Sequence, residues 1–166
     1  TFLGTGSTIE ATGTGSITIN ATSGDTGERG IFFQKGSQVR TNSGDLSVTG
    51  TGTTGGTLLH DSGTIVSSTS GNVVMTGASA GTGLFIEKST SGVTSDTGTI
   101  TLTGTGTTGL GFGGFVGNGT TSGDITLNSD SLLITATGLV RSSGALLIDP
   151  QTDSTTIGLG GGTGTL

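Results

Sequence analysis

Short stretches in which hydrophobic and polar residues alternate recur along this chain, each directly after a glycine that follows Ser or Thr. Alternation with a period of two predicts a strand with one buried face. The stretches are SITINAT from Ser16, DLSVTGT from Asp45, NVVMTGA from Asn72, TITLTGT from Thr99, DITLNSD from Asp124 and ALLIDPQ from Ala145. Their start positions, 16, 45, 72, 99, 124 and 145, are separated by 29, 27, 27, 25 and 21 residues. This recurrence indicates an internal repeat.

Two further apolar segments follow each alternating stretch. The second segment comes after a glycine, as GIFFQ from Gly30, GTLLH from Gly56, GLFIE from Gly83 and GLGFG from Gly109. The third segment is shorter and is centred on Val39, Ile65, Val93 and Val116. The start of the chain fits the second and third segments of an earlier unit, with Thr1–Leu3 aligned to Thr57–Leu59 and Ile9 aligned to Ile65. Each unit therefore predicts three strands separated by three turns.

Three strands in each unit of 21–29 residues predict an all-β fold, the parallel β-helix or β-solenoid, in which every unit is one coil. A variable repeat length suits this fold, because additional residues bulge out at a corner. We expect six to seven coils over residues 1–149, with coil starts near 16, 45, 72, 99, 124 and 145. Residues 150–166 hold the only proline, Pro150, and a glycine run at 160–162, and are predicted to be an irregular final coil or the start of a further unit.

Two positions of the alternating stretch are expected to form columns along the stack. Asp45, Asn72 and Asp124 share the first position with Ser16 and Thr99, which predicts an outward polar ladder. Uncharged Asn72 and Thr99 separate the two aspartates of this ladder, so like charges are not adjacent. The sixth position is small throughout, which leaves room for the chain to turn, and holds Ala21, Gly50, Gly77, Gly104 and Ser129.

Composition narrows the class of protein. Gly, Thr and Ser supply 93 of the 166 residues, which is typical of flexible linkers, but the mean hydropathy of +0.12 and the 10% of charged residues argue against disorder. The net charge is −6 and the five Lys and Arg are scattered, so nucleic-acid binding is not expected. Cysteine is absent, and no apolar run reaches the roughly 20 residues of a membrane span. Because the chain begins with Thr1, we expect it to be a mature or excised part of a longer protein.

The phrases SGDLSVTGTGTTGG, SGNVVMTGASAGTG and TGTITLTGTGTTGLG resemble the filamentous-haemagglutinin-like β-strand-repeat proteins of bacteria. The tail TTIGLGGGTGTL is similar to segments of the same proteins, so the resemblance covers nearly the whole chain. It implies a right-handed parallel β-helix, export to the cell surface, and a role in adhesion, biofilm matrix or surface fibres. It implies no catalytic residues and no cofactor.

The residues suited to chemistry are few. His60, the only histidine, is predicted to be a solvated corner residue beside Asp61, because no second histidine or cysteine accompanies it. Gln34, Asp61, Glu87 and Gly113 follow the second strands in turn, so Asp61 and Glu87 are possible neighbours for a weak cation. A surface ladder without function is the simpler interpretation of these carboxylates. The sequence therefore predicts no catalytic, cofactor-binding or metal-binding residue, and no enzyme.

The sequence favours a rigid rod or spacer in an extracellular adhesive protein or fibre. Its expected partners are neighbouring coils of one long chain or end-to-end copies of itself, together with surface glycans or other cells. A carbohydrate-binding or carbohydrate-cleaving β-helix is the alternative, and the scarcity of aromatic residues counts against it, since the core is expected to need part of the set Phe32, Phe33, Phe85, Phe112 and Phe115. Ice binding is less favoured, because only one of five outward residue pairs is Thr-x-Thr, the pairs being Thr18/Asn20, Ser47/Thr49, Val74/Thr76, Thr101/Thr103 and Thr126/Asn128.

Overall fold

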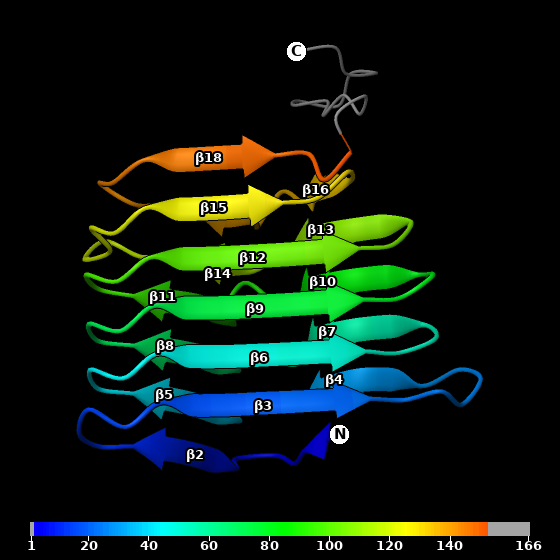
Figure 1. Ribbon diagram of the computed structural model, residues 1–166, viewed down its shortest axis with the longest axis horizontal. Coiled ribbons are helices and arrows are strands. Elements are labelled where there is room, and N and C mark those ends of the chain that lie inside the picture. The colour runs from blue at the N-terminus through cyan, green and yellow to red at the C-terminus, as the bar shows by residue number, and fades with distance from the viewer. Residues whose placement is uncertain (1, 153–166) are drawn as a thin grey trace.

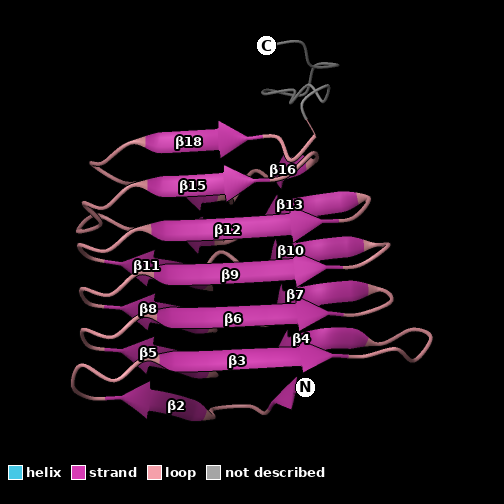
Figure 2. Cartoon of the chain, in the orientation of Figure 1, coloured by secondary structure: helices cyan, strands magenta, loops and turns pink. Residues whose placement is uncertain are grey.

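A computed structural model describes residues 2–152 of the chain, and within this range every regular element is a strand. The strands form three parallel sheets of six strands each (Figures 1 and 2). Sheet A holds β1 (Phe2–Leu3), β4 (Arg29–Phe33), β7 (Gly55–Leu59), β10 (Thr82–Ile86), β13 (Thr108–Phe112) and β16 (Leu132–Ile134). Sheet B holds β2 (Thr8–Ala11), β5 (Gln38–Thr41), β8 (Ile65–Ser68), β11 (Gly92–Ser95), β14 (Phe115–Val116) and β17 (Leu139–Val140). Sheet C holds β3 (Ile17–Thr22), β6 (Leu46–Thr51), β9 (Val73–Ala78), β12 (Ile100–Thr105), β15 (Ile125–Asn128) and β18 (Leu146–Asp149).

The chain visits the three sheets in turn and so winds into a β-solenoid with three strands per turn. In Figure 1 the sheet C strands run from left to right at the front, and the chain then returns behind them. Each turn lies above the previous one, so the coil is right-handed. The described residues make about five to six turns. The sequence predicts six to seven coils over residues 1–149, so the number of turns lies at the lower end of this expectation or just below it. Most of the predicted irregular final coil or further unit, residues 150–166, lies outside the described residues. No helix in residues 2–152 is long and apolar enough to cross a membrane.

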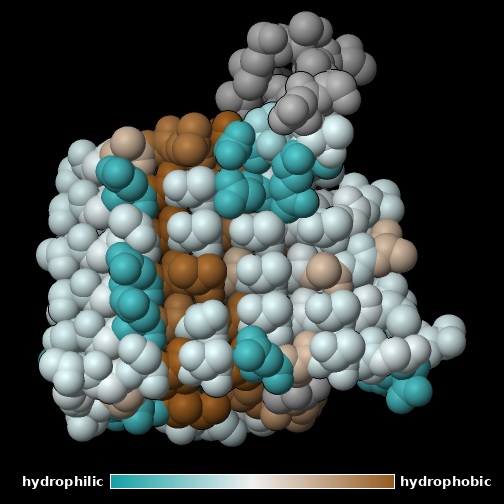
Figure 3. All heavy atoms as spheres, in the orientation of Figure 1, coloured by the Kyte–Doolittle hydropathy of each residue, from teal (hydrophilic) through white to brown (hydrophobic). Residues whose placement is uncertain are grey.

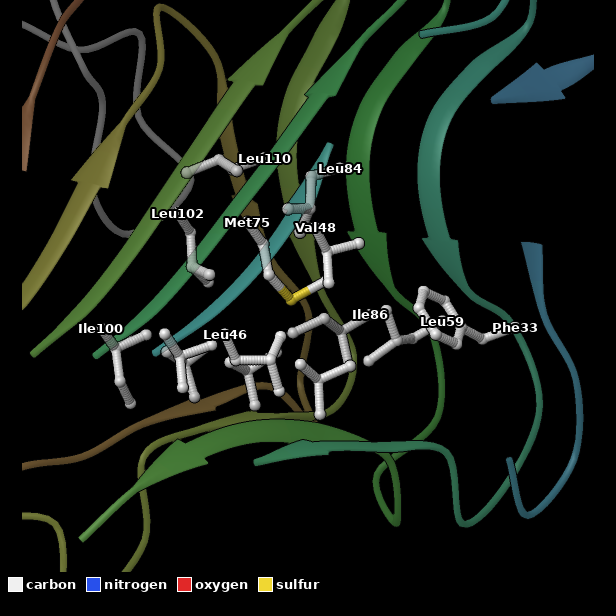
Figure 4. Close-up of a cluster of buried hydrophobic side chains, with 14 of the residues drawn as sticks. Phe33, Leu46, Val48, Leu59, Met75, Leu84, Ile86, Ile100, Leu102 and Leu110 are labelled. Carbon is white, nitrogen blue, oxygen red and sulfur yellow. The ribbon is translucent and has the colours of Figure 1, made fainter. Parts of the chain in front are cut away.

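The register of sheet C confirms the alignment of the alternating stretches. Ile17 pairs with Leu46, Leu46 with Val73, and the column continues through Ile100, Ile125 and Leu146. Two residues further on, Ile19, Val48, Met75, Leu102, Leu127 and Ile148 form a second inward column. Figure 4 shows side chains of both columns meeting Phe33, Leu59, Ile86 and Leu110 of sheet A in one narrow core.

The predicted alignment of the third apolar segments is wrong by one residue in one coil, where Val66 and not Ile65 takes the inward position. Val39 pairs with Val66, and Val66 pairs with Val93, whereas Ile65 pairs with Gln38 and Gly92. Val66 is fully buried, while Ile65 is only half-buried and lies on the outer surface. Ile9 therefore matches Val66 and not Ile65, since Ile9 pairs with Val39. In a segment as short as GTIVSS, two adjacent β-branched residues fit the inward position equally well, and only the neighbouring rungs decide between them.

The expected polar ladder is present, and its side chains bond to the backbone. At four of the five steps an oxygen of one rung accepts a hydrogen bond from the backbone N–H of the next rung, namely Ser16 Oγ from Asp45 (3.1 Å), Asp45 Oδ1 from Asn72 (2.8 Å), Asn72 Oδ1 from Thr99 (2.9 Å) and Asp124 Oδ1 from Ala145 (2.8 Å). The glycine before each of these residues is required by close packing. A Cβ on Gly71 would lie 2.1 Å from the carbonyl oxygen of Gly44, and a Cβ on Gly98 would lie 2.2 Å from that of Gly71. The repeated SG and TG thus mark a corner where successive backbones touch.

The same corner buries a line of hydroxyl groups. Ser95 is fully buried, its Oγ donates to the carbonyl oxygen of Gly71 (2.8 Å) and it accepts from the N–H of Gly98 (3.0 Å). One coil below Ser95, Ser68 Oγ accepts in the same way from the N–H of Gly71, three residues further along the same turn (2.9 Å). These hydroxyls satisfy backbone groups that the turn removes from the sheets.

The small sixth position of the alternating stretch has the role expected of it. Gly50, Gly77 and Gly104 lie where sheet C meets sheet A, and Ala21 pairs with Gly50 at the start of the column. A Cβ on Gly77 would lie 2.0 Å from the carbonyl oxygen of Gly83. The two sheets approach closely at this corner, because neither strand carries a side chain there.

Candidate binding groove on sheet A

An apolar column runs along the outer surface of sheet A. The strand register aligns Phe2, Phe32, Leu58, Phe85, Gly111 and Leu133. Phe2 is 60% exposed and Leu133 is 48% exposed, while Phe32, Leu58 and Phe85 are half-buried. Large apolar side chains that repeat along one outer face contribute little to the core, and such a contiguous patch is typical of an interaction site.

The phenylalanines divide between inside and outside. Phe33 and Phe112 are fully buried in the core. Phe32 and Phe85 point outward on sheet A, and Phe115 lies on the outer side of sheet B. The expectation that the core uses part of this set is confirmed for two residues. The other three aromatic side chains lie on the outer surface, where a sugar ring could stack on them.

The outer column forms the floor of a shallow depression, which we call the sheet A groove. Its volume is about 260 Å³. Most of the residues that line it come from three outward columns, with Arg29, Thr82 and Thr108 on one side, Leu58, Phe85 and Leu133 along the middle, and His60 and Glu87 on the other side. A second depression of about 230 Å³ continues over Phe2, Glu28, Arg29 and Phe32. Apolar surface is thus bordered on both sides by groups that form hydrogen bonds.

His60 lies in the position that the sequence analysis gave to Asp61. Leu59 pairs with Ile86, so the residues that follow, His60 and Glu87, are neighbours on successive rungs. The predicted adjacency of Asp61 and Glu87 is therefore wrong by one residue. His60 Nδ1 lies against Glu87 Oε2, and Lys88 Nζ contacts the other carboxylate oxygen of Glu87. The His60 ring also lies 5.1 Å from the ring of Phe32, so the histidine belongs to the groove wall.

Arg29 lies flat across the other wall of the groove. Its guanidinium carbon lies 5.0 Å from the centre of the Phe32 ring, within the range of a cation–π contact. Its side-chain carbons pass over Gly55 of the next rung, where a Cβ would lie 3.2 Å from Arg29 Cγ. Phe32 stacks in turn on Phe2, with 5.6 Å between ring centres. Within residues 2–152 Arg29 has no carboxylate partner, so its N–H groups are available to a ligand.

The outer face of sheet C carries the residues considered for ice binding. The register aligns Thr18, Ser47, Val74, Thr101, Thr126 and Leu147 in one outward column, and Asn20, Thr49, Thr76, Thr103, Asn128 and Asp149 in the next. Figure 3 shows this face as pale columns of weakly polar side chains, with brown hydrophobic surface between them and interrupting them. Val74 and Leu147 interrupt the first column and are 39% and 53% exposed. In the second column, threonine hydroxyl groups occupy three consecutive rungs, Thr49, Thr76 and Thr103, with Asn or Asp on the other rungs.

Candidate metal ligands do not gather in the described part of the chain. Within residues 2–152 no group of three or more His, Asp or Glu side chains lies close enough together to hold a metal ion. The carboxylate of Glu87 is already shared between His60 and Lys88.

No protein-family model, curated protein or solved structure matches this chain. The β-solenoid fold consequently rests on the strand register and the buried columns described above.

Sequence reasoning missed the sheet A groove because an outward phenylalanine and an inward one look alike in a short apolar run. GIFFQ contains both kinds side by side, Phe32 facing outward and Phe33 facing the core. The signal that separates them is the alternation within each second segment, read together across coils. Phe32, Leu58, Phe85 and Leu133 share one phase, and Phe33, Leu59, Ile86 and Phe112 share the other.

Proposed function

We propose that this chain is a rigid, non-enzymatic β-solenoid rod within an extracellular bacterial surface protein or fibre of the filamentous-haemagglutinin-like kind, where it acts as a spacer in adhesion. The observation that carries the proposal is the unbroken parallel register of all three sheets over successive coils. Hydrogen bonds between strands lie along the axis, and each coil adds about 4.8 Å of length. Such a stack transmits force along its axis without a hinge.

The last described coil favours continuation of the stack. Ile134 and Leu146 occupy inward columns, yet they are 42% and 52% exposed. The residues below them in the same columns, Phe112 and Ile125, are fully buried. Another coil stacked on this end would cover Ile134 and Leu146. We propose that such coils come from the same long chain or from an end-to-end copy.

A replacement experiment in the native chain tests the spacer role. The segment is replaced either by a flexible Gly/Ser linker of equal residue number or by an unrelated β-solenoid of similar length. We expect the flexible linker to abolish adhesion while the protein still reaches the cell surface, and the unrelated solenoid to restore adhesion. Antibody labelling of intact cells monitors surface display in both cases. Equal adhesion with the flexible linker would rule out a mechanical role, and lack of labelling on intact cells would rule out the surface location.

A further inference from the structure

We infer that the sheet A groove binds a neutral polysaccharide chain laid along the solenoid axis. This site is separate from the proposed rod function, because it uses outward side chains that do not belong to the buried core. A sugar chain has apolar ring faces and hydroxyl groups at its edges. The groove offers the complementary arrangement, with aromatic and aliphatic side chains in the middle and polar side chains on both walls.

The placement of aromatic residues is the first observation that supports this ligand. The chain has six phenylalanines, and three of them, Phe2, Phe32 and Phe85, lie in the one outer column of sheet A. None of the three contributes to the buried core, and Phe85 also covers Gly111, which occupies the corresponding position of the next rung. Exposed aromatic side chains cost solubility and favour association. Their concentration in one column is therefore explained by binding.

The dimensions of the groove suit an extended ligand. Leu58 and Leu133 are three rungs apart in the register, which corresponds to about 14 Å. Together with the second depression over Phe32 and Phe2, the groove follows the outer column of sheet A. It thus accommodates several consecutive sugar rings and not a compact cofactor.

The charges of the groove are balanced, and this favours a neutral chain over an acidic one. The carboxylate of Glu87 is paired with the ammonium group of Lys88. Glu28 and Arg29 lie side by side at the other end. With a net charge of −6 on the whole molecule, a polyanion would be repelled at long range. Arg29, Thr82 and Thr108 supply hydrogen-bond donors that suit sugar hydroxyls.

Binding is tested with the 166-residue chain and two neutral probes, cellohexaose and maltohexaose, by titration calorimetry, with hexagalacturonate as the acidic probe. We expect one of the neutral probes to bind, and Phe85→Ala and Phe32→Ala each to weaken its affinity at least fivefold. Phe115→Ala is the matched control, since it removes an outward phenylalanine from sheet B, and we expect no change. Circular dichroism and the thermal midpoint verify that each variant folds.

Several results would overturn the inference. These are no binding of either neutral hexasaccharide at millimolar concentration, binding that Phe85→Ala and Phe32→Ala leave intact, and binding of hexagalacturonate alone. Lateral dimers that disappear in Phe85→Ala, seen by sedimentation without any sugar binding, would assign the column to self-association. Because these variants leave the stack intact, failure of the groove proposal and failure of the rod proposal are distinguishable.

Discussion

The ring of Phe85 lies over Gly111 of the next rung, so closely that a Cβ on Gly111 would be 2.1 Å from Phe85 Cδ2. The same relationship occurs on sheet B, where the ring of Phe115 covers Gly92. An aromatic side chain laid over a cross-strand glycine shields its backbone from water and fixes the ring. Gly111 therefore gives Phe85 its position in the groove floor.

Alanine substitutions of two glycines should differ in their effect on stability, because one added Cβ meets backbone atoms and the other meets a side chain. Gly77→Ala places a Cβ against the backbone carbonyl of Gly83, and we expect it to lower the free energy of unfolding by about 1–3 kcal/mol or more. Gly111→Ala meets only the Phe85 ring, which can rotate away, so we expect a smaller loss. Urea denaturation measures both. Gly24→Ala, where no atom lies within 4 Å, is the control and should be close to neutral. Equal losses at positions 77 and 111 would contradict the packing at the sheet C to sheet A corner.

The polar ladder predicts a salt-dependent effect of charge. Asn72→Asp places a second carboxylate one rung from Asp45, and we expect a loss of about 0.2–1 kcal/mol of stability at low salt. Because both groups are exposed, the loss should shrink at about 1 M salt, where the Debye length is about 3 Å. Thermal midpoints at the two salt concentrations measure it. Asn72→Ser keeps an acceptor without charge and should show no such salt dependence. A loss of stability in Asn72→Asp that is equal at both salt concentrations would argue against adjacent carboxylates.

The corrected register of sheet B is testable with two neighbouring residues. Val66→Ala opens a cavity in the core and should cost about 2 kcal/mol, because Val66 is fully buried. Ile65→Ala removes a larger side chain, yet it should cost less, since Ile65 lies on the outer face. Chemical denaturation of the two variants gives the order directly. A larger loss of unfolding free energy for Ile65→Ala than for Val66→Ala would contradict this register and favour the alignment of Ile65 with Val39 and Val93.

Buried hydroxyls at the sheet B to sheet C corner should matter more than exposed ones. Ser95→Ala leaves the N–H of Gly98 without the hydroxyl acceptor, and we expect a loss of about 1–3 kcal/mol. Ser70→Ala is the matched control, because its hydroxyl is exposed and its bond to the Asn42 carbonyl is 3.5 Å long. Hydrogen exchange at Gly98 supplies a local measurement, and we expect faster exchange in Ser95→Ala alone. Unchanged exchange there would show that the hydroxyl does not protect this amide.

The sequence was sufficient to predict the solenoid because its signal is repeated in every coil. Six alternating stretches, each preceded by glycine, aligned Ile17 with Leu46 and Val73 without ambiguity. The two wrong alignments occur where the inward position was assigned from one coil without comparison with its neighbours. Ile65 was chosen over Val66, and Asp61 over His60, because a short strand with two adjacent candidates does not fix its own phase. The groove depends on three columns that come together only after folding, so its walls were not evident from any single segment.

The ladder that joins Asp45 to Asn72 and Asn72 to Thr99 gives the stack a direction. At these steps a coil presents an oxygen acceptor to the coil that comes after it in the chain. The two ends of the stack therefore differ in chemistry, since one displays side-chain acceptors and the other displays backbone N–H donors. A coil contacts mainly the coils directly before and after it, 21–29 residues away, so a stack of this kind lengthens by addition of units without contacts to distant parts of the chain.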